Sequence, residues 1–221
     1  MRRRNCVEVL LPTTKHRRGR RTARQEAALA SASAYLLAGG ADLAAVFDGW
    51  PVVLDMGFGT GEAVITYAES DPATRILAVD MHTPGIGDLL ASIAEGGLSN
   101  VFVIEADVRE VLTNGVHTGM IAGARSLFPD PWPKKRHHRR RLIQPEFVEM
   151  LADRMMIGAT WHIATDWPDY AKHIEGVLAA SSQWLGGRVP RPHDRPLTRF
   201  ERRGLAAGRQ PIDLRYARAQ S

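Results

Sequence analysis

The chain has 221 residues, of which 44% are hydrophobic, and its 29 Lys and Arg residues outnumber its 24 Asp and Glu residues to give a net charge of +5. This length is sufficient to bury one sizeable core, and the hydrophobic content is normal for a soluble globular protein. The single cysteine, Cys6, excludes an internal disulfide and a cysteine-rich metal site, and it fits the reducing conditions of a cytoplasm.

The first 24 residues carry much of the excess positive charge. Arg2–Arg4 followed by Val9–Leu11 superficially imitates an export signal, but Glu8 interrupts the apolar run, which is too short for a signal core. No segment approaches the ~18–20 apolar residues that span a bilayer. We therefore predict a flexible basic arm over residues 1–24, a single domain over residues 25–221 and no membrane contact.

Periodicity and chain-breaking residues predict alternating strands and helices. The first helix is expected over Thr22–Gly39, because its alanine-rich helical pattern stops at a Gly-Gly pair. The elements expected next are, in chain order, strand Val52–Asp55, helix Glu62–Glu69, strand Ile76–Asp80, helix Gly85–Glu95, strand Val101–Ala106, helix Val108–Thr113, a weak strand near Met120–Phe128, helix Ile143–Met155, strand Thr160–Thr165 and helix Trp167–Ser181. Two last strands, near Trp184–Val189 and Asp213–Tyr216, are expected to form an antiparallel closing pair. This alternation predicts an α/β fold with a doubly wound, mostly parallel sheet that binds its ligands at the carboxyl ends of the strands.

A glycine-rich loop joins the first predicted strand to its helix in the segment P-V-V-L-D-M-G-F-G-T-G at 51–61. Glycines such as Gly57 and Gly59 allow a tight turn and a close approach of the backbone to a ligand. Folds that hold a pyrophosphate read G-x-G-x-x-G, whereas here Asp55 stands two residues before G-x-G-x-G. Its carboxylate would repel a pyrophosphate. It suits a nucleoside with a cationic amino acid end, and S-adenosylmethionine is such a ligand.

Acids also follow the next two predicted strands. Asp80 comes nineteen residues after Gly61, a spacing at which an acid reaches ribose hydroxyls. Asp107 is positioned to accept from an adenine amino group, a role for which Glu105 competes, and its alternative role is the N-cap of the helix that begins at Val108. Asp80 would bind the ribose of NAD equally well, so only the spacing of the glycine loop favours S-adenosylmethionine over NAD.

The most unusual segment is L-F-P-D-P-W-P-K-K at 127–135, which runs directly into R-H-H-R-R-R at 136–141. Three prolines alternate with Asp130 and Trp132, and they exclude a helix and hold both side chains in an extended loop. The cations attract phosphates and the indole offers a face for a base to stack on. A solvated helix face, a localisation signal and a structural turn are the alternatives. An acid between these groups suggests chemistry on a nucleobase.

Together these motifs resemble those of the bacterial tRNA (guanine-N7)-methyltransferases, a class I S-adenosylmethionine-dependent family, from about Arg17 to Arg218. The segments that carry the resemblance are D-M-G-F-G-T-G at Asp55–Gly61, D-M-H-T-P-G-I-G at Asp80–Gly87, the F-P-D-P-W-P-K-K-R-H-H-R-R-R block, A-T-D-W at Ala164–Trp167 and R-P-L-T-R-F-E-R-R-G at Arg195–Gly204. The first is generic to class I methyltransferases, and the other four together are specific. The resemblance implies a Rossmann-like domain that methylates N7 of a guanosine in the variable loop of tRNA.

The same resemblance implies roles for individual residues. The residues implied to contact S-adenosylmethionine are Asp55, Gly57, Gly59, Asp80 and Asp107. Around Asp130 as the central catalytic acid, the residues implied to face the guanine are Asp166, Thr198 and Glu201. Those implied to hold the RNA are Lys134, Lys135 and Arg136. The chain departs from the family where Asp55 and Asp80 replace the common glutamate and where Pro133 replaces histidine, but no carboxylate is lost.

The chemistry requires no general base, because guanine N7 already carries a lone pair. Carboxylates beside the base stabilise the positive charge that develops on the purine, and for this we favour Asp130 and Asp166. The Pro- and Arg-rich segment 189–203 is read either as a surface crossover or as a lid that presents Thr198 and Glu201. We expect the N-terminal arm to become ordered on RNA, no obligate protein partner, a monomer or homodimer, and a cytoplasmic location.

Three other functions remain open on the sequence. The chain could be a class I methyltransferase that acts on protein or on a small molecule, in which case the basic blocks would not be needed for turnover. A non-catalytic RNA-binding protein would fail to bind S-adenosylmethionine. A nicotinamide-dependent enzyme is disfavoured by the glycine spacing.

Overall fold

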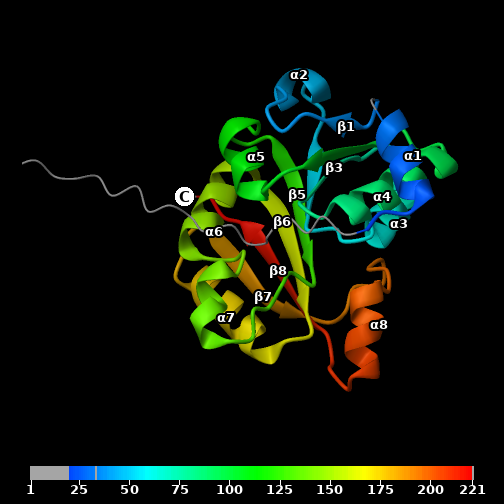
Figure 1. Ribbon diagram of the computed structural model, residues 1–221. Coiled ribbons are helices and arrows are strands. Elements are labelled where there is room, and N and C mark those ends of the chain that lie inside the picture. Colours follow the sequence, from blue (N-terminus) through cyan, green and yellow to red (C-terminus); the bar gives the residue numbers. More distant parts are fainter. Residues whose placement is uncertain (1–19, 33, 221) are drawn as a thin grey trace, which may run out of the picture.

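The computed structural model describes residues 20–32 and 34–220 (Figure 1). Residues 1–19 of the predicted arm lie outside this part of the chain. The elements are, in order, α1 (Ala23–Ser31), β1 (Leu36–Leu37), α2 (Leu43–Phe47), β2 (Val52–Met56), α3 (Glu62–Ser70), β3 (Arg75–Asp80), α4 (Thr83–Gly96), β4 (Val101–Glu105), α5 (Val108–Asn114), β5 (Ile121–Leu127), the 3-10 helix η1 (Lys135–Arg140), α6 (Pro145–Arg154), β6 (Met155–Thr165), α7 (Pro168–Ala179), β7 (Trp184–Val189), α8 (Arg199–Ala206) and β8 (Ile212–Arg218).

The strands form one eight-stranded sheet in the order β1-β4-β3-β2-β5-β6-β8-β7. Strands β1 to β6 pair with one another in parallel, and β8 pairs antiparallel with both β6 and β7. This confirms the predicted doubly wound sheet with an antiparallel closing pair. Since the strand order reverses between β2 and β5, the carboxyl ends of these two strands mark the crevice where such folds bind ligands.

Helices cover both faces of the sheet (Figure 1). On one face α5, α6 and α7 bury a large cluster that contains Phe147, Trp161 and Tyr170. On the other face α1, α3 and α4 bury a second cluster around Val64 and Ile86. The two clusters use opposite faces of the same strands, which is why β2 and β3 read as nearly continuous apolar runs in the sequence. Helix α8 stands apart from both layers.

The predicted helix over Thr22–Gly39 was too long. Its start is confirmed by a capping box, in which the Thr22 side chain accepts from the backbone of Gln25 and the Gln25 side chain accepts from that of Thr22. The helix ends at Ser31, and the chain then forms β1, whose pairing with β4 begins where Tyr35 O accepts from Val103 N at 2.8 Å. Tertiary pairing thus overrides the alanine-rich helix propensity of this segment.

Other boundaries also differ from the prediction. The short α2 was not predicted, although its Asp42 N-cap is a recognisable start signal. The strand predicted to be weak, β5, is central, because ladders on both sides compensate for its glycine and alanines. Strand β6 begins five residues before the predicted Thr160, directly after α6 ends at Arg154. None of the helices in the described part of the chain is both long and apolar enough to cross a bilayer.

Candidate active site

Five aspartates lie at the carboxyl ends of five neighbouring parallel strands. They are, in sheet order, Asp107 after β4, Asp80 at the end of β3, Asp55 near the end of β2, Asp130 after β5 and Asp166 after β6. Because parallel strands end at the same sheet edge, residues separated by more than a hundred positions are brought to one rim. We call this row of five aspartates the acidic rim, and it lies in a chain that is basic as a whole.

Asp80 holds the glycine loop in place. Its Oδ2 accepts from the backbone N–H of Gly59 at 2.8 Å, and its Oδ1 accepts from the N–H groups of Met81 and His82 at 2.7 and 2.9 Å. Burial nevertheless dominates these hydrogen bonds, and it raises the pKa of Asp80 above its usual range. An acid already fixed by three backbone donors is well placed to accept from a hydroxyl group without reorganisation.

Asp55 is buried beneath the same loop, and its Oδ2 has no hydrogen-bond partner among the described residues. Burial raises the pKa of this carboxyl to about 6, although the positive charge of Arg125 on the neighbouring strand opposes the rise and Asp80 adds to it. An unpaired buried acceptor is costly, and it is characteristic of a position that receives a polar or cationic ligand group.

The loop beside Asp55 is shaped for close contact with a ligand. Gly57, Gly59 and Gly61 all have positive φ, of 73°, 63° and 80°. A Cβ on Gly57 would meet nothing within 4 Å, whereas one on Gly61 would lie 2.7 Å from Leu89. Gly61 is therefore required for packing, and Gly57 leaves open space above the backbone. Together with the unpaired oxygen of Asp55, this cradle fits a nucleoside with a cationic end.

Asp107 performs the capping role that was the alternative reading. Its Oδ1 accepts from the backbone of Arg109 at 3.0 Å, which caps α5, and the Arg109 guanidinium closes on both carboxylate oxygens. The competing acid, Glu105, accepts from the Thr83 hydroxyl at 2.5 Å. Capping does not exclude a ligand contact, because each carboxylate oxygen has more than one lone pair.

The Pro-rich loop after β5 has a strained backbone. Phe128 and Trp132 have φ values of 57° and 44°, which are uncommon for aromatic residues. Phe128 N donates to Ala164 O at 2.7 Å, and Arg141, with a buried side chain, donates to Pro131 O at 2.9 Å. These bonds hold the exposed Asp130 at the sheet edge. Strain of this kind is stored mainly at functional sites.

The basic block adopts the 3-10 helix η1, which was not predicted. The side chains of Lys134, Lys135 and Arg136 are exposed, so they are available to a large partner. Arg140 lies over the Trp132 ring at 5.2 Å, and His137 contacts the same ring edge-on. Arg141 instead turns inward to Asp169, so the last residue of the block is structural.

The Pro- and Arg-rich segment after β7 contains an extended stretch and then α8, a helix that was not predicted. Thr198 caps α8 by accepting from Glu201 N at 3.2 Å, and the Thr-x-x-Glu spacing is a recognisable helix-start signal that the Pro- and Arg-rich context obscured. Phe200 in the first turn lies on Gly59, and it also lines a cavity of about 20 Å³ together with Asp55 and Thr198. Helix α8 therefore covers the glycine loop.

The three other residues implied to face the guanine have different surroundings in the structure. Asp166 accepts from Arg209 at 2.7 Å, and it packs so tightly on Gly204 of α8 that a Cβ there would lie 2.3 Å from its Oδ2. Thr198 is buried at the cavity beside the glycine loop. Glu201 is buried and its carboxylate is bound by Arg195. Sequence reasoning assigned no role to Arg195 or Gly204, although both lie within the R-P-L-T-R-F-E-R-R-G segment.

Comparison with solved structures defines the class of protein. The fold is similar to that of the 16S rRNA methyltransferase KamB, with a TM-score of 0.57 and 20% identity over 77% of this chain and 88% of that one. It is also similar to that of an antibiotic-related methyltransferase, with a TM-score of 0.56 and 20% identity over 80% of this chain and 92% of the other. The chain thus has the class I methyltransferase fold.

Sequence comparison identifies the family. A family described as putative methyltransferase matches residues 50–214. A tRNA (guanine-N(7)-)-methyltransferase of Streptomyces coelicolor is 48% identical over 185 residues, which cover 81% of this chain and 68% of the relative. The protein of the same name from Leifsonia xyli subsp. xyli is 43% identical over 209 residues, covering 90% and 92%. The chain belongs to the tRNA (guanine-N7)-methyltransferase family.

Proposed function

We propose that this chain transfers a methyl group from S-adenosylmethionine to N7 of a guanosine in tRNA, in the variable loop as the family resemblance implies. The observation that carries the proposal is the convergence of the strand-end aspartates with the Pro-Asp-Pro-Trp loop and its basic block at one edge of the sheet. The names of the relatives supply the substrate. We further propose that the enzyme acts in the cytoplasm.

The cofactor would lie along the acidic rim, where it supplies an electrophilic methyl group on a sulfonium. The residues proposed to hold it are Asp55, Gly57, Gly59, Asp80 and Asp107. The unpaired oxygen of Asp55 suits a cationic amino group, and the open space above Gly57 admits a ligand directly against the backbone. Asp80 and Asp107 supply acceptors for hydroxyl and amino groups of a nucleoside.

Asp130 is proposed to face the guanine as the central acid, with Asp166 and Thr198 beside it. N7 needs no deprotonation, so the task of these groups is to orient the base and to stabilise the positive charge that the purine gains. Arg209 contacts one oxygen of Asp166, Oδ2, and so orients the carboxylate. The resemblance assigns Glu201 to the same set, but both oxygens of its carboxylate accept hydrogen bonds from Arg195.

Lys134, Lys135 and Arg136 are proposed to hold the RNA backbone. They are exposed on η1, immediately after the loop that carries Asp130, so a bound phosphate would lie beside the base being methylated. Exposed cations of this kind contribute mainly non-specific, salt-dependent affinity.

The proposal is tested by incubating the protein with bulk tRNA and S-adenosylmethionine labelled in its methyl group, and then analysing the nucleosides. We expect label in 7-methylguanosine. A transcript in which 7-deazaguanosine replaces guanosine lacks the acceptor nitrogen, and it should accept no methyl group. Label in another nucleoside, or label in protein or small molecules only, would contradict the proposal.

A further inference from the structure

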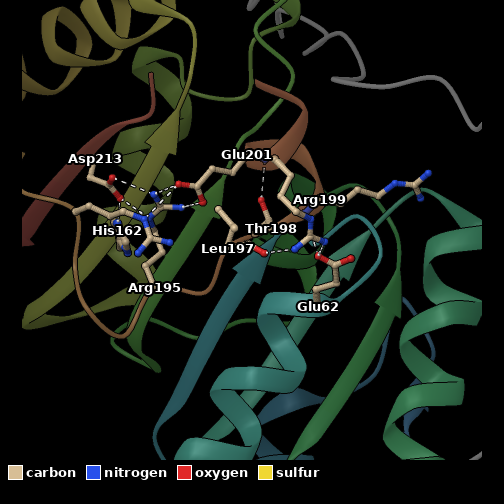
Figure 2. Close-up of polar contacts among 10 residues, drawn as sticks. Glu62, His162, Arg195, Leu197, Thr198, Arg199, Glu201 and Asp213 are labelled. Atoms are coloured by element: carbon tan, nitrogen blue, oxygen red, sulfur yellow. Dashed lines mark hydrogen bonds and ion pairs between the residues drawn. The ribbon is translucent and has the colours of Figure 1, made fainter. Parts of the chain in front are cut away.

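Arg195 lies fully buried between carboxylates from two separate elements (Figure 2). Its Nη1 and Nη2 atoms donate to the two oxygens of Glu201 on α8, at 2.6 and 2.7 Å. Its Nη2 also donates to Oδ2 of Asp213 on β8 at 3.3 Å, and its Nε lies 2.8 Å from Oδ1 of Asp213 as an ion-pair contact outside hydrogen-bond geometry. One guanidinium thus joins the helix that covers the glycine loop to the sheet.

Two further side chains contact this cluster. His162 on β6 lies 2.8 Å from Asp213 through Nε2, and Arg191 donates from Nε to Glu201 at 3.2 Å. Burial tends to raise the pKa of Glu201, but the hydrogen bonds from Arg195 and Arg191 outweigh burial and the pKa lies below its usual value. Glu201 is therefore held as a carboxylate whose partners are the two arginines. If the Glu201 carboxylate moved away to bind another group, the buried positive charge of Arg195 would lose part of its compensation.

Glu201 in turn fixes the start of α8. It occupies the third helical position, and its backbone N–H donates to the Thr198 side chain, which caps the helix. Phe200 stands between Thr198 and Glu201 in the sequence and lies on Gly59. Any displacement of Glu201 therefore moves both Thr198 and Phe200 relative to the glycine loop.

A second attachment of α8 is much weaker. Glu62, at the start of α3, accepts from Arg199 N and from the Arg202 side chain at 2.9 and 2.8 Å (Figure 2). The Glu62 and Arg202 side chains are 41% and 51% exposed, and exposed ion pairs contribute little. Of these two ion pairs, the buried one between Arg195 and Glu201 is the more costly to break, and Gly204 of α8 also packs on Asp166.

We propose that Arg195 is the positioning residue of the lid formed by residues 196–206, and that Glu201 acts as its partner on the lid and not as a ligand of the guanine. Arg195 acts through Thr198 and Phe200, which it holds at the glycine loop. This proposal depends on the proposed function only for the position of the substrate. The link between Arg195 and Glu201 can be tested without measuring enzymatic activity.

A double-mutant cycle in the full-length protein separates the two roles of Glu201. The variants are Arg195→Met, Glu201→Gln and the double variant, with Arg188→Met as the matched control because Arg188 pairs with Glu175 at an exposed site away from the lid. Single-turnover rates with saturating tRNA and S-adenosylmethionine should fall roughly 10- to 100-fold in each single variant, since this is the loss expected from misplacing a site by about 1 Å. The double variant should lose no more than the worse single variant, because the two residues act as one unit.

Hydrogen exchange of the α8 amides gives a readout that does not depend on turnover. Arg195→Met and Glu201→Gln should both lose protection over residues 199–206 while the core strands keep theirs, and Arg188→Met should match the wild type. If the wild type makes no 7-methylguanosine, the proposed function fails while this readout still tests the link. Wild-type protection and turnover in Arg195→Met, together with a large loss of turnover in Glu201→Gln, would make Glu201 a direct ligand and overturn the proposal. Multiplicative losses in the double variant would also overturn it.

Discussion

Phe200 lies on Gly59, so closely that a Cβ at position 59 would stand 2.7 Å from the edge of the ring. The two residues are separated by 141 positions in the chain, and they join the lid helix α8 to the loop that is proposed to hold the cofactor. The glycine is needed here for two independent reasons, its positive φ and the ring above it. These two contributions can be measured separately.

We expect Gly59→Ala to destabilise the unliganded protein more than Gly57→Ala does. Both glycines have positive φ, which costs an alanine roughly 1–2 kcal/mol, but a Cβ at Gly57 meets nothing within 4 Å. The difference between the two variants should therefore report the contact with Phe200. Urea unfolding of each variant, in wild-type and Phe200→Ala backgrounds, measures it. If Gly59→Ala remains more destabilising than Gly57→Ala in the Phe200→Ala background, the Phe200 ring is not what excludes a Cβ at position 59.

Asp55→Asn should stabilise the unliganded protein at pH 8. The folded-state pKa of about 6 lies above the usual value of roughly 3.9, so the stabilising contribution of protonated Asp55 is fully present only below pH ~4 and is lost as the pH rises through 6. At pH 8 the buried carboxylate then costs on the order of 1–3 kcal/mol. Unfolding measured at pH 5 and pH 8 should show the gain in the variant growing with pH. An equal gain at both values would contradict the raised pKa.

Binding of S-adenosylhomocysteine by the wild type should become tighter as the pH rises, whereas the contribution of Asp55 to the stability of the unliganded protein falls. The ionised form of Asp55 is the one that attracts a cationic amino group, so wild-type affinity should increase between pH 5 and pH 7. Asp55→Asn should bind weakly at all pH values in this range. Titration calorimetry tests this, and wild-type affinity in the variant would remove Asp55 from the proposed cofactor site.

Replacing Lys134, Lys135 and Arg136 by alanine should weaken tRNA binding and flatten its salt dependence. Each phosphate contact that is lost lowers the slope of log K against log salt by ~0.9 or less. Filter binding at several salt concentrations measures the slope. Arg188→Ala, which removes an exposed cation from β7, should leave it unchanged. A wild-type slope in the triple variant would mean that these exposed cations do not contact the RNA.

Asp130→Asn should lower turnover by ~10²–10³ with little change in tRNA affinity, because the amide keeps the shape but loses the charge that stabilises the cationic purine. High pH should not restore the rate, since N7 needs no general base. Single-turnover rates from neutral to alkaline pH test both statements. A near-normal rate would reduce the Pro-Asp-Pro-Trp loop to a scaffold, with Asp166 carrying the charge.

Local patterns in the sequence were sufficient to predict the sheet and the acidic rim. Apolar runs that end in Asp55, Asp80 and Asp107 identify parallel strands, because a strand buried on both faces must be apolar until it emerges at the sheet edge. The glycine loop was equally readable, since Gly57, Gly59 and Gly61 adopt backbone angles that other residues avoid. These features depend on neighbours close in the chain.

The tertiary structure decided which acids have partners. Asp80 is bound by Gly59, Asp166 by Arg209 and Glu201 by Arg195, whereas one oxygen of Asp55 has no partner in the described part of the chain. The sequence suggested a ligand group for each of these carboxylates, but it did not indicate which of them would be bound by another group of the protein. The partner of a carboxylate is set by which cation or N–H shares its buried site. That depends on how distant segments pack, as with Arg195 between α8 and β8, and no local pattern encodes it.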